Sequence, residues 1–237
     1  MSARALSRPG RAVTLGGHPG CLAVPADARF LLLLAHGAGA GMRHPFMAGV
    51  SAALAAEGVA TARFEFPYMA AGRPRPDAPT VAETTVREAW AAVRKRFPDL
   101  PAFAGGKSYG GRMTSRAHAA APLEGVRGLV FLGFPLHPAG KPGVDRADHL
   151  EDAAGPLLFV QGERDALAEL RMLRPVLRKL GRRATLHVMA GADHGFSVPR
   201  SSGREPEDVR AEIAGAVRAW MEGVTSAGGS RGRSTVR

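Results

Sequence analysis

Residues 105–111 read GGKSYGG and follow a short apolar segment, residues 102–104. Two kinds of turn match this stretch. A Gly-Lys-Ser triplet is typical of the P-loop, whose backbone amides bind nucleotide phosphates. The pattern Gly106-x-Ser108-x-Gly110 matches the turn that exposes a nucleophilic serine between a strand and a helix. Because the first turn binds a nucleotide and the second attacks an acyl group, the function of the chain depends on this stretch.

The residues around the motif do not fit a P-loop. A P-loop has a glycine five residues before its Gly-Lys pair, and position 101 is proline. The next apolar segment, residues 128–133, also ends without an acidic side chain that would bind magnesium. The nucleophile turn, by contrast, needs glycines two residues before and two residues after its serine, and Gly106 and Gly110 occupy those positions. The sequence therefore favours Ser108 as a nucleophile.

A serine nucleophile of this kind needs a base and an acid, which follow it in the order acid, then histidine. The predicted strand 185–189 leads into Asp193, His194 and Gly195, so we expect His194 to be the base. The predicted strand 157–160 leads into Glu163 and Asp165. Asp193 adjoins the histidine and would approach its ring awkwardly, and Glu163 lies nearer the strand. Asp165 is the favoured acid, with Glu163 and Asp193 as the alternatives.

A glycine-rich turn, residues 36–41 (HGAGAG), follows the buried strand predicted at 29–35. Such a turn lets a backbone N–H point at the serine. We expect the amides of Ala38 and Tyr109 to form an oxyanion hole and His36 to support the turn.

Short apolar segments alternate with longer helical patterns along the whole chain, which is typical of a three-layer α/β/α sandwich with a mostly parallel sheet. The capping-box pattern of residues 80–83 predicts the start of one helix. Two long loops, 67–79 and 133–150, are expected at the carboxyl ends of strands, and neither is long enough for a large lid. The predicted organisation is a flexible N-terminus (1–11), one domain (12–224) and a disordered basic tail (225–237).

Over residues 13–223 the sequence resembles the α/β-hydrolase superfamily. Within it, the chain is similar to the small, lid-poor branch near the dienelactone hydrolases, and to a group marked by Gly-Gly-Lys-Ser-x-Gly-Gly-Arg at the nucleophile turn. Dienelactone hydrolases use a cysteine nucleophile, whereas this chain has Ser108, so their substrate is not carried over. The resemblance implies the α/β-hydrolase fold and a Ser-His-Asp triad.

Four residues near the expected active edge are candidates for substrate binding. Tyr68 and Met69 would form an apolar wall, and Arg73 would attract an anionic group. Lys107 would either hold such a group or, as we prefer, pair with a buried acid or carbonyl, because an unpaired buried lysine is costly.

The composition of the chain limits the partners, the location and the cofactors that we expect. The 237 residues carry a net charge of +11, which falls to +5 without the six arginines of the two terminal segments. No nucleic-acid-binding motif accompanies this charge, so we expect no nucleic acid as a partner. No apolar segment is long enough to span a bilayer, so we expect no membrane as a partner and a cytoplasmic location. Cys21 is the sole cysteine, and no histidines have metal-ligand spacing, so neither a metal nor another cofactor is expected.

These features predict a serine hydrolase acting on carboxylic esters or thioesters of small acyl compounds, with no cofactor. The alternative is a protein of the same fold that has lost turnover and acts as an interaction module.

Overall fold

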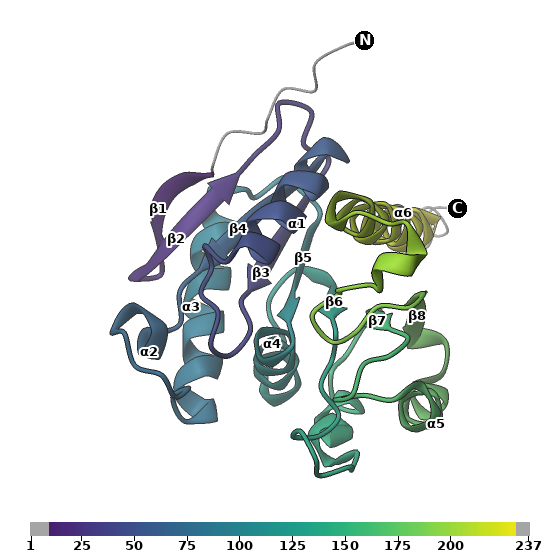
Figure 1. Cartoon of the computed structure of the whole chain (residues 1–237). Helices are drawn as coiled ribbons and strands as arrows, with labels where there is room; N and C mark the ends of the chain where they lie inside the picture. Colours follow the sequence, from purple (N-terminus) through teal and green to yellow (C-terminus); the bar gives the residue numbers. More distant parts are fainter. Residues whose placement is uncertain (1–9, 231–237) are drawn as a thin grey trace, which may run out of the picture.

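The computed structural model describes residues 10–230, and these form a single sheet covered by helices on both faces (Figure 1). The strands are β1 (Arg11–Leu15), β2 (His18–Ala23), β3 (Phe30–Ala35), β4 (Val59–Phe64), β5 (Ala102–Lys107), β6 (Val126–Leu132), β7 (Leu157–Gly162) and β8 (Ala184–Met189). The helices are α1 (Pro45–Ala56), α2 (Pro67–Ala70), α3 (Pro79–Arg96), α4 (Tyr109–Ala120), α5 (Leu170–Leu180) and α6 (Pro206–Ser230), with short 3₁₀ segments η1 (Asp145–Leu150), η2 (Gly181–Arg183) and η3 (Arg200–Ser202).

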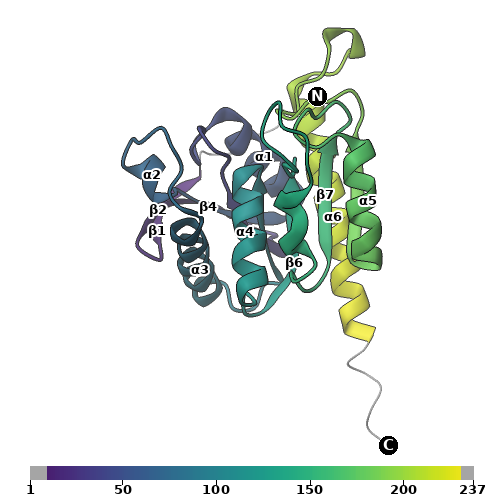
Figure 2. The same cartoon turned by 90° about the horizontal axis from the view of Figure 1, so that it is seen from below.

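The sheet has the order β1-β2-β4-β3-β5-β6-β7-β8. The strands from β4 to β8 in this order run parallel, and β2 pairs antiparallel with both β1 and β4. Helices α3, α4 and α5 cover one face, and α1 and α6 cover the other (Figures 1 and 2). This arrangement confirms the predicted three-layer α/β/α sandwich, and no large lid is inserted into it.

Strand β3 shows why the sheet is covered on both faces. All six of its residues, FLLLLA, are buried. Because side chains alternate across a strand, Leu31 and Leu33 pack into one core, whereas Leu32 and Leu34 pack into the other. A fully apolar strand of this kind fits only the interior of a sheet with helices on both sides.

Three sequence predictions are corrected by the structure. The basic tail was expected to begin at residue 225, but α6 continues to Ser230, and the Thr225 hydroxyl donates to the Met221 carbonyl within it. Of the predicted flexible N-terminus, Arg11 already belongs to β1. The capping box at residues 80–83 does not form, because α3 starts at Pro79 with Ala78 as its cap and Glu83 pairs with Arg116 instead. The remaining parts of the two terminal segments, residues 1–9 and 231–237, lie outside the described residues.

Within residues 10–230, no helix is both long enough and apolar enough to cross a membrane.

The backbone of β6 leaves no room for a side chain at Gly105 of β5. Gly105 pairs with Val130, and a Cβ atom built on Gly105 would lie 1.9 Å from the Val130 carbonyl oxygen. We predict that Gly105→Ala lowers the free energy of unfolding by at least about 2 kcal/mol, because the backbone of one strand must shift. Denaturant unfolding followed by circular dichroism measures this change.

Gly215→Ala is the matched control for this substitution. Gly215 lies in α6, and a Cβ atom there has no neighbour within 4 Å. In a helix this change is expected to raise the free energy of unfolding by roughly 0.5–1 kcal/mol. Equal stability of wild type and Gly105→Ala would contradict the close approach of the two strands.

Candidate active site

The turn between β5 and α4 places Ser108 in a strained backbone conformation, with φ 48° and ψ −113°. A Cβ atom on Gly106 would lie 2.5 Å from the Ala35 carbonyl oxygen, and one on Gly110 would lie 2.5 Å from that of His36. Only glycine therefore allows the start of α4 to pass so close to the end of β3. The geometry agrees with the need for glycines inferred from the sequence.

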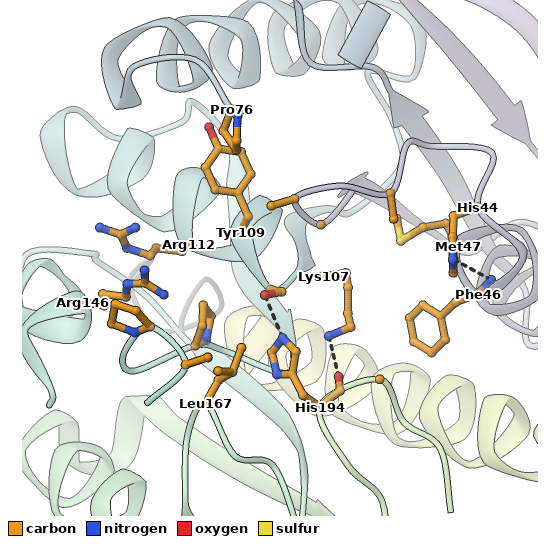
Figure 3. A pocket seen from close by; sticks show the side chains of 18 residues that line it. His44, Phe46, Met47, Pro76, Lys107, Tyr109, Arg112, Arg146, Leu167 and His194 are labelled. Atoms are coloured by element: carbon orange, nitrogen blue, oxygen red, sulfur yellow. Dashed lines mark hydrogen bonds between the residues drawn. The ribbon is translucent and has the colours of Figure 1, made fainter. Parts of the chain in front are cut away.

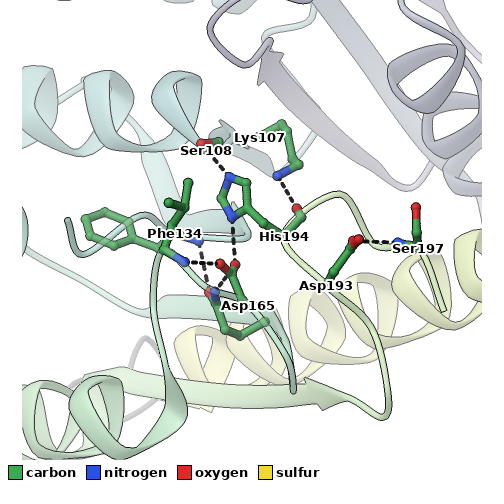
Figure 4. Close-up of polar contacts among 9 residues, drawn as sticks. Lys107, Ser108, Phe134, Asp165, Asp193, His194 and Ser197 are labelled. Atoms are coloured by element: carbon green, nitrogen blue, oxygen red, sulfur yellow. Dashed lines mark hydrogen bonds and ion pairs between the residues drawn. The ribbon is translucent and has the colours of Figure 1, made fainter. Parts of the chain in front are cut away.

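Ser108, His194 and Asp165 meet at the carboxyl edge of the sheet (Figure 4). His194 Nε2 lies 2.9 Å from Ser108 Oγ, and His194 Nδ1 lies 2.7 Å from Asp165 Oδ2. Because an ionised carboxylate only accepts hydrogen bonds, we assign the ring proton to Nδ1 and the accepting lone pair to Nε2. The ring is thereby oriented to take the proton of the Ser108 hydroxyl.

The other two acids considered for this position bond elsewhere. Glu163 accepts a hydrogen bond from the Gly191 amide at 2.7 Å, and Asp193 accepts one from the Ser197 amide at 2.8 Å. Both therefore shape the loop that follows β8, and Asp165 is the acid on the histidine.

Gln161, which the sequence analysis did not single out, holds Asp165 in place. Its Nε2 donates to Asp165 Oδ2 at 2.5 Å, and its Oε1 accepts from the Phe134 amide at 2.9 Å. The Leu167 amide donates to the other carboxylate oxygen at 2.8 Å. The Asp165 side chain is fully buried, so these donors replace the water that an ionised carboxylate needs. The sequence gives no clear signal for this role, because Gln161 directly follows the strand predicted at 157–160 and only the structure extends β7 to Gly162.

The two amides predicted to bind an oxyanion lie at the same edge. Tyr109 is the first residue of α4, where the amide has no acceptor within the helix. Ala38 follows Gly37, whose Cβ, if added, would lie 3.9 Å from Ser108 Cβ. Both Ala38 and Tyr109 line the same cavity as Ser108.

His36 fixes the turn that contains Ala38. It is fully buried, its Nδ1 donates to the Gly37 carbonyl at 2.8 Å, and its Nε2 accepts from the Phe66 amide at 3.1 Å. Burial lowers the pKa of His36, which favours this neutral form. Nδ1 thus binds within the turn and Nε2 connects the turn to the segment after β4, as expected for a supporting residue.

Lys107 contacts the loop that carries the histidine. Its Nζ donates to the His194 carbonyl at 2.6 Å and lies 5.4 Å from the centre of the Phe196 ring. Burial lowers the pKa of Lys107 to about 8. Of the two roles considered, the bond to a carbonyl is the one present.

A cavity of about 700 Å³ opens beside Ser108 (Figure 3). Its walls combine apolar and basic side chains with the backbone of two turns. The lining residues are Gly37, Ala38, Ala40, His44, Phe46, Met47, Pro76, Lys107, Ser108, Tyr109, Arg112, Pro135, Pro138, Ala139, Arg146, Leu167, His194 and Gly195.

Three of the residues predicted to bind substrate do not line this cavity. Tyr68 is fully buried, Met69 packs against the core, and Arg73 forms an ion pair with Asp77 at 2.6 Å. The reason is local: the predicted loop 67–79 begins as helix α2, and the Tyr68 amide donates to Asp77 at 2.8 Å, which folds the segment back on itself. Of the four candidates, only Lys107 lines the cavity.

Several lining residues were not predicted as site residues, among them His44, Phe46, Arg112 and Arg146. Arg112 had a signal, since it ends the motif that begins at Gly105 and lies one helical turn after Ser108. Within the described residues, no group of three or more His, Cys, Asp or Glu side chains is arranged to hold a metal ion.

Comparison with solved structures finds the same fold in several bacterial proteins. A dienelactone hydrolase from Anabaena variabilis is 22% identical, with a TM-score of 0.70 over 90% of this chain and 95% of that one. An α/β serine hydrolase without a lid from Xanthomonas campestris is 22% identical, with a TM-score of 0.69 over 91% and 96%. The protein TT1662 from Thermus thermophilus is 21% identical, with a TM-score of 0.67 over 91% and 97%.

The family model of the alpha/beta hydrolase domain matches residues 28–222, which span the sheet from before β3 to the middle of α6. This match covers the turn at Ser108, the acid loop after β7 and the histidine loop after β8. The chain therefore belongs to the α/β-hydrolase family.

Proposed function

We propose that this protein is a serine hydrolase that cleaves carboxylic esters or thioesters of small acyl compounds. The observation that carries the proposal is the unbroken series of hydrogen bonds from Ser108 through His194 to Asp165 beside an open cavity. Relatives described as a dienelactone hydrolase, a serine hydrolase and an esterase share the fold and support the same class of reaction.

The reaction follows from the roles of these groups. Ser108 Oγ attacks the acyl carbon while His194 Nε2 takes the hydroxyl proton, and the amides of Ala38 and Tyr109 bind the oxyanion that forms. The bond to the leaving alcohol or thiol then breaks, and His194 returns the proton to it. Water attacks the acyl-enzyme with His194 again as the base, which releases the acid and restores Ser108.

An interaction protein without turnover is the weaker alternative. Such a protein would have no need of the strained φ of Ser108 or of a buried carboxylate satisfied by several donors, and both cost stability. Their presence together favours an enzyme.

Lys107 acts as a positioning residue in this scheme. It holds the carbonyl of His194, and so fixes the backbone from which the imidazole projects. Phe196, which lies under the ammonium group, has a left-handed φ of 64°, so the lysine also restrains a strained loop.

We predict that Ser108→Ala abolishes hydrolysis of 4-nitrophenyl acetate and leaves the thermal midpoint nearly unchanged, because the substitution removes the nucleophile and keeps the Cβ atom. Release of 4-nitrophenolate and differential scanning fluorimetry measure the two quantities. Loss of labelling by a fluorophosphonate probe provides an independent readout. Undiminished hydrolysis in the purified variant would disprove the assignment of the nucleophile.

Asp165→Asn should lower kcat by about three to four orders of magnitude, because an amide favours the wrong imidazole tautomer, as in the Ser-His-Asp triads from which this magnitude is taken. Asp193→Asn is the matched control, since Asp193 adjoins the histidine but bonds to the Ser197 amide. We expect it to cost roughly tenfold or less. A severe loss at Asp193 with near-normal turnover at Asp165 would mean that the acid is wrongly assigned.

Lys107→Met should lower kcat by about tenfold or more, with a smaller change in KM, because the histidine loop loses its restraint. It should also change how stability depends on pH. Burial lowers the pKa of Lys107 from its ordinary value near 10.5 to about 8, so between these two values the unfolded chain binds one more proton than the folded protein.

The free energy of unfolding of the wild type should therefore rise relative to that of Lys107→Met as the pH increases from about 8 toward 10.5. Urea denaturation of both proteins at several pH values between 7.5 and 10 tests this. Parallel curves for the two proteins would show that Lys107 is not buried as a charged group.

A further inference from the structure

Two arginines lie together on one wall of the cavity at Ser108. Arg112 comes from α4 and Arg146 comes from η1, and both line the cavity. Figure 3 shows their guanidinium groups beside each other on one side of His194, with Phe46 and Met47 on the opposite side. The two arginines therefore lie on one side of the cavity, next to Leu167, while Lys107 and His44 lie on the side of Phe46 and Met47.

Neither arginine has a partner of opposite charge. Within the part of the chain that the structure describes, no carboxylate pairs with Arg112 or Arg146, and the Nε atom of Arg112 is buried without a hydrogen-bond acceptor. Glu83, an acid whose charge acts on Arg112, is bound by Arg116 at 2.6 Å. The pair is thus a concentration of positive charge that no carboxylate of the described residues contacts as an ion pair.

Seven arginines of the described residues, by contrast, form ion pairs with acids. The ion pairs are Arg29–Glu222, Arg73–Asp77, Arg116–Glu83, Arg171–Glu169, Arg204–Glu212, Arg210–Glu207, Arg218–Glu57 and Arg218–Glu222.

Holding two guanidinium groups side by side is unfavourable in the empty protein. Burial and then the charge of Arg146 lower the pKa of Arg112, and burial lowers that of Arg146, yet both remain protonated at neutral pH because arginine does so in proteins generally. An oxyanion bound between them would remove the mutual repulsion and accept the free N–H donors. Guanidinium groups match the planar geometry of a carboxylate and also bind phosphate oxygens strongly.

We propose that Arg112 and Arg146 form a subsite for an anionic group, a carboxylate or a phosphate monoester, carried by the ester that Ser108 cleaves. Arg112 lies in the first turn of α4, where its amide donates to the Ser108 carbonyl at 3.0 Å, and both side chains line the same cavity. This inference rests on the proposed hydrolase activity and specifies its substrate class.

The kinetic test compares esters that differ only in charge. One pair carries the charge on the acyl half: 4-nitrophenyl hemiglutarate and its methyl ester. The other carries it on the leaving half: 4-acetoxybenzoate and its methyl ester. The measured quantity is the ratio of kcat/KM for the charged ester to that for the neutral one, so that a general loss of activity cancels.

For at least one pair we expect this ratio to fall by about tenfold or more in Arg112→Gln and in Arg146→Gln, mainly through KM, and to recover in part in Arg112→Lys. Arg43→Gln is the matched control. Arg43 is exposed and does not line the cavity, although its neighbour His44 does. The ratio should stay unchanged in this variant, which removes the same charge nearby.

A binding measurement separates failure of the subsite from failure of the hydrolase proposal. Calorimetric titration of Ser108→Ala with glutarate and with propyl phosphate should show binding that weakens about tenfold or more when Arg112→Gln is added. The ligand that loses more affinity identifies the oxyanion. The subsite would be overturned, and the hydrolase left intact, by two results together. Neutral esters would be hydrolysed and the ratio of kcat/KM for charged and neutral esters would be the same in wild type and in the arginine variants. The ligands would also bind equally to Ser108→Ala with and without Arg112→Gln. Arginine-dependent binding without hydrolysis of any ester would support the subsite and refute the hydrolase.

Discussion

The close passage of α4 past the end of β3 is the constraint on which the site depends. Gly106 and Gly110 place the turn within contact of the Ala35 and His36 carbonyls, and this holds Ser108 at a φ of 48°. A larger residue at either glycine would push α4 away from β3, and Ser108 would lose its position at the edge of the sheet. The strain is maintained by the packing of β5 between β3 and β6, because a sheet interior that is apolar on both faces does not yield locally.

Around this turn, the groups that touch the serine or its partner are each held by a second layer of hydrogen bonds. Gln161 and the Leu167 amide orient Asp165, while Lys107 fixes the backbone of His194. On the other side, His36 holds the turn of Ala38. Such support keeps rotamers within the narrow range that proton transfer needs, without adding flexible contacts to the substrate. The lid-less cavity can therefore stay open while the reacting groups remain ordered.

The sequence predicted the parts of this site that depend on chain order and missed those that depend on packing. The order of motifs along the chain predicts the roles of Ser108 and His194 and the alternation of strands and helices. Parallel strands bring their carboxyl ends to one edge of the sheet, whatever side chains lie between the strands. The choice of Asp165 over Glu163 and Asp193 was an inference, and the hydrogen bonds now distinguish the three. Tyr68, Met69 and Arg73 were misplaced because a four-residue helix and an ion pair turned their loop away. The roles of Gln161, Arg112 and Arg146 could not be predicted, because each role depends on residues that only the fold brings close together.

The distribution of charge leads to the same conclusion about specificity as the geometry. A net charge of +11 suggests a generally basic surface, but seven arginines of the described residues form ion pairs with acids. What a ligand meets inside the cavity is set by the groups left without a partner, because compensated pairs contribute little field at a distance. Arg112 and Arg146 are such groups, and they lie on the side of the catalytic histidine opposite to Phe46 and Met47 (Figure 3). This positive charge is therefore built into two helical segments, α4 and η1, and an ester that carries an anionic group is the substrate that we propose for this arrangement.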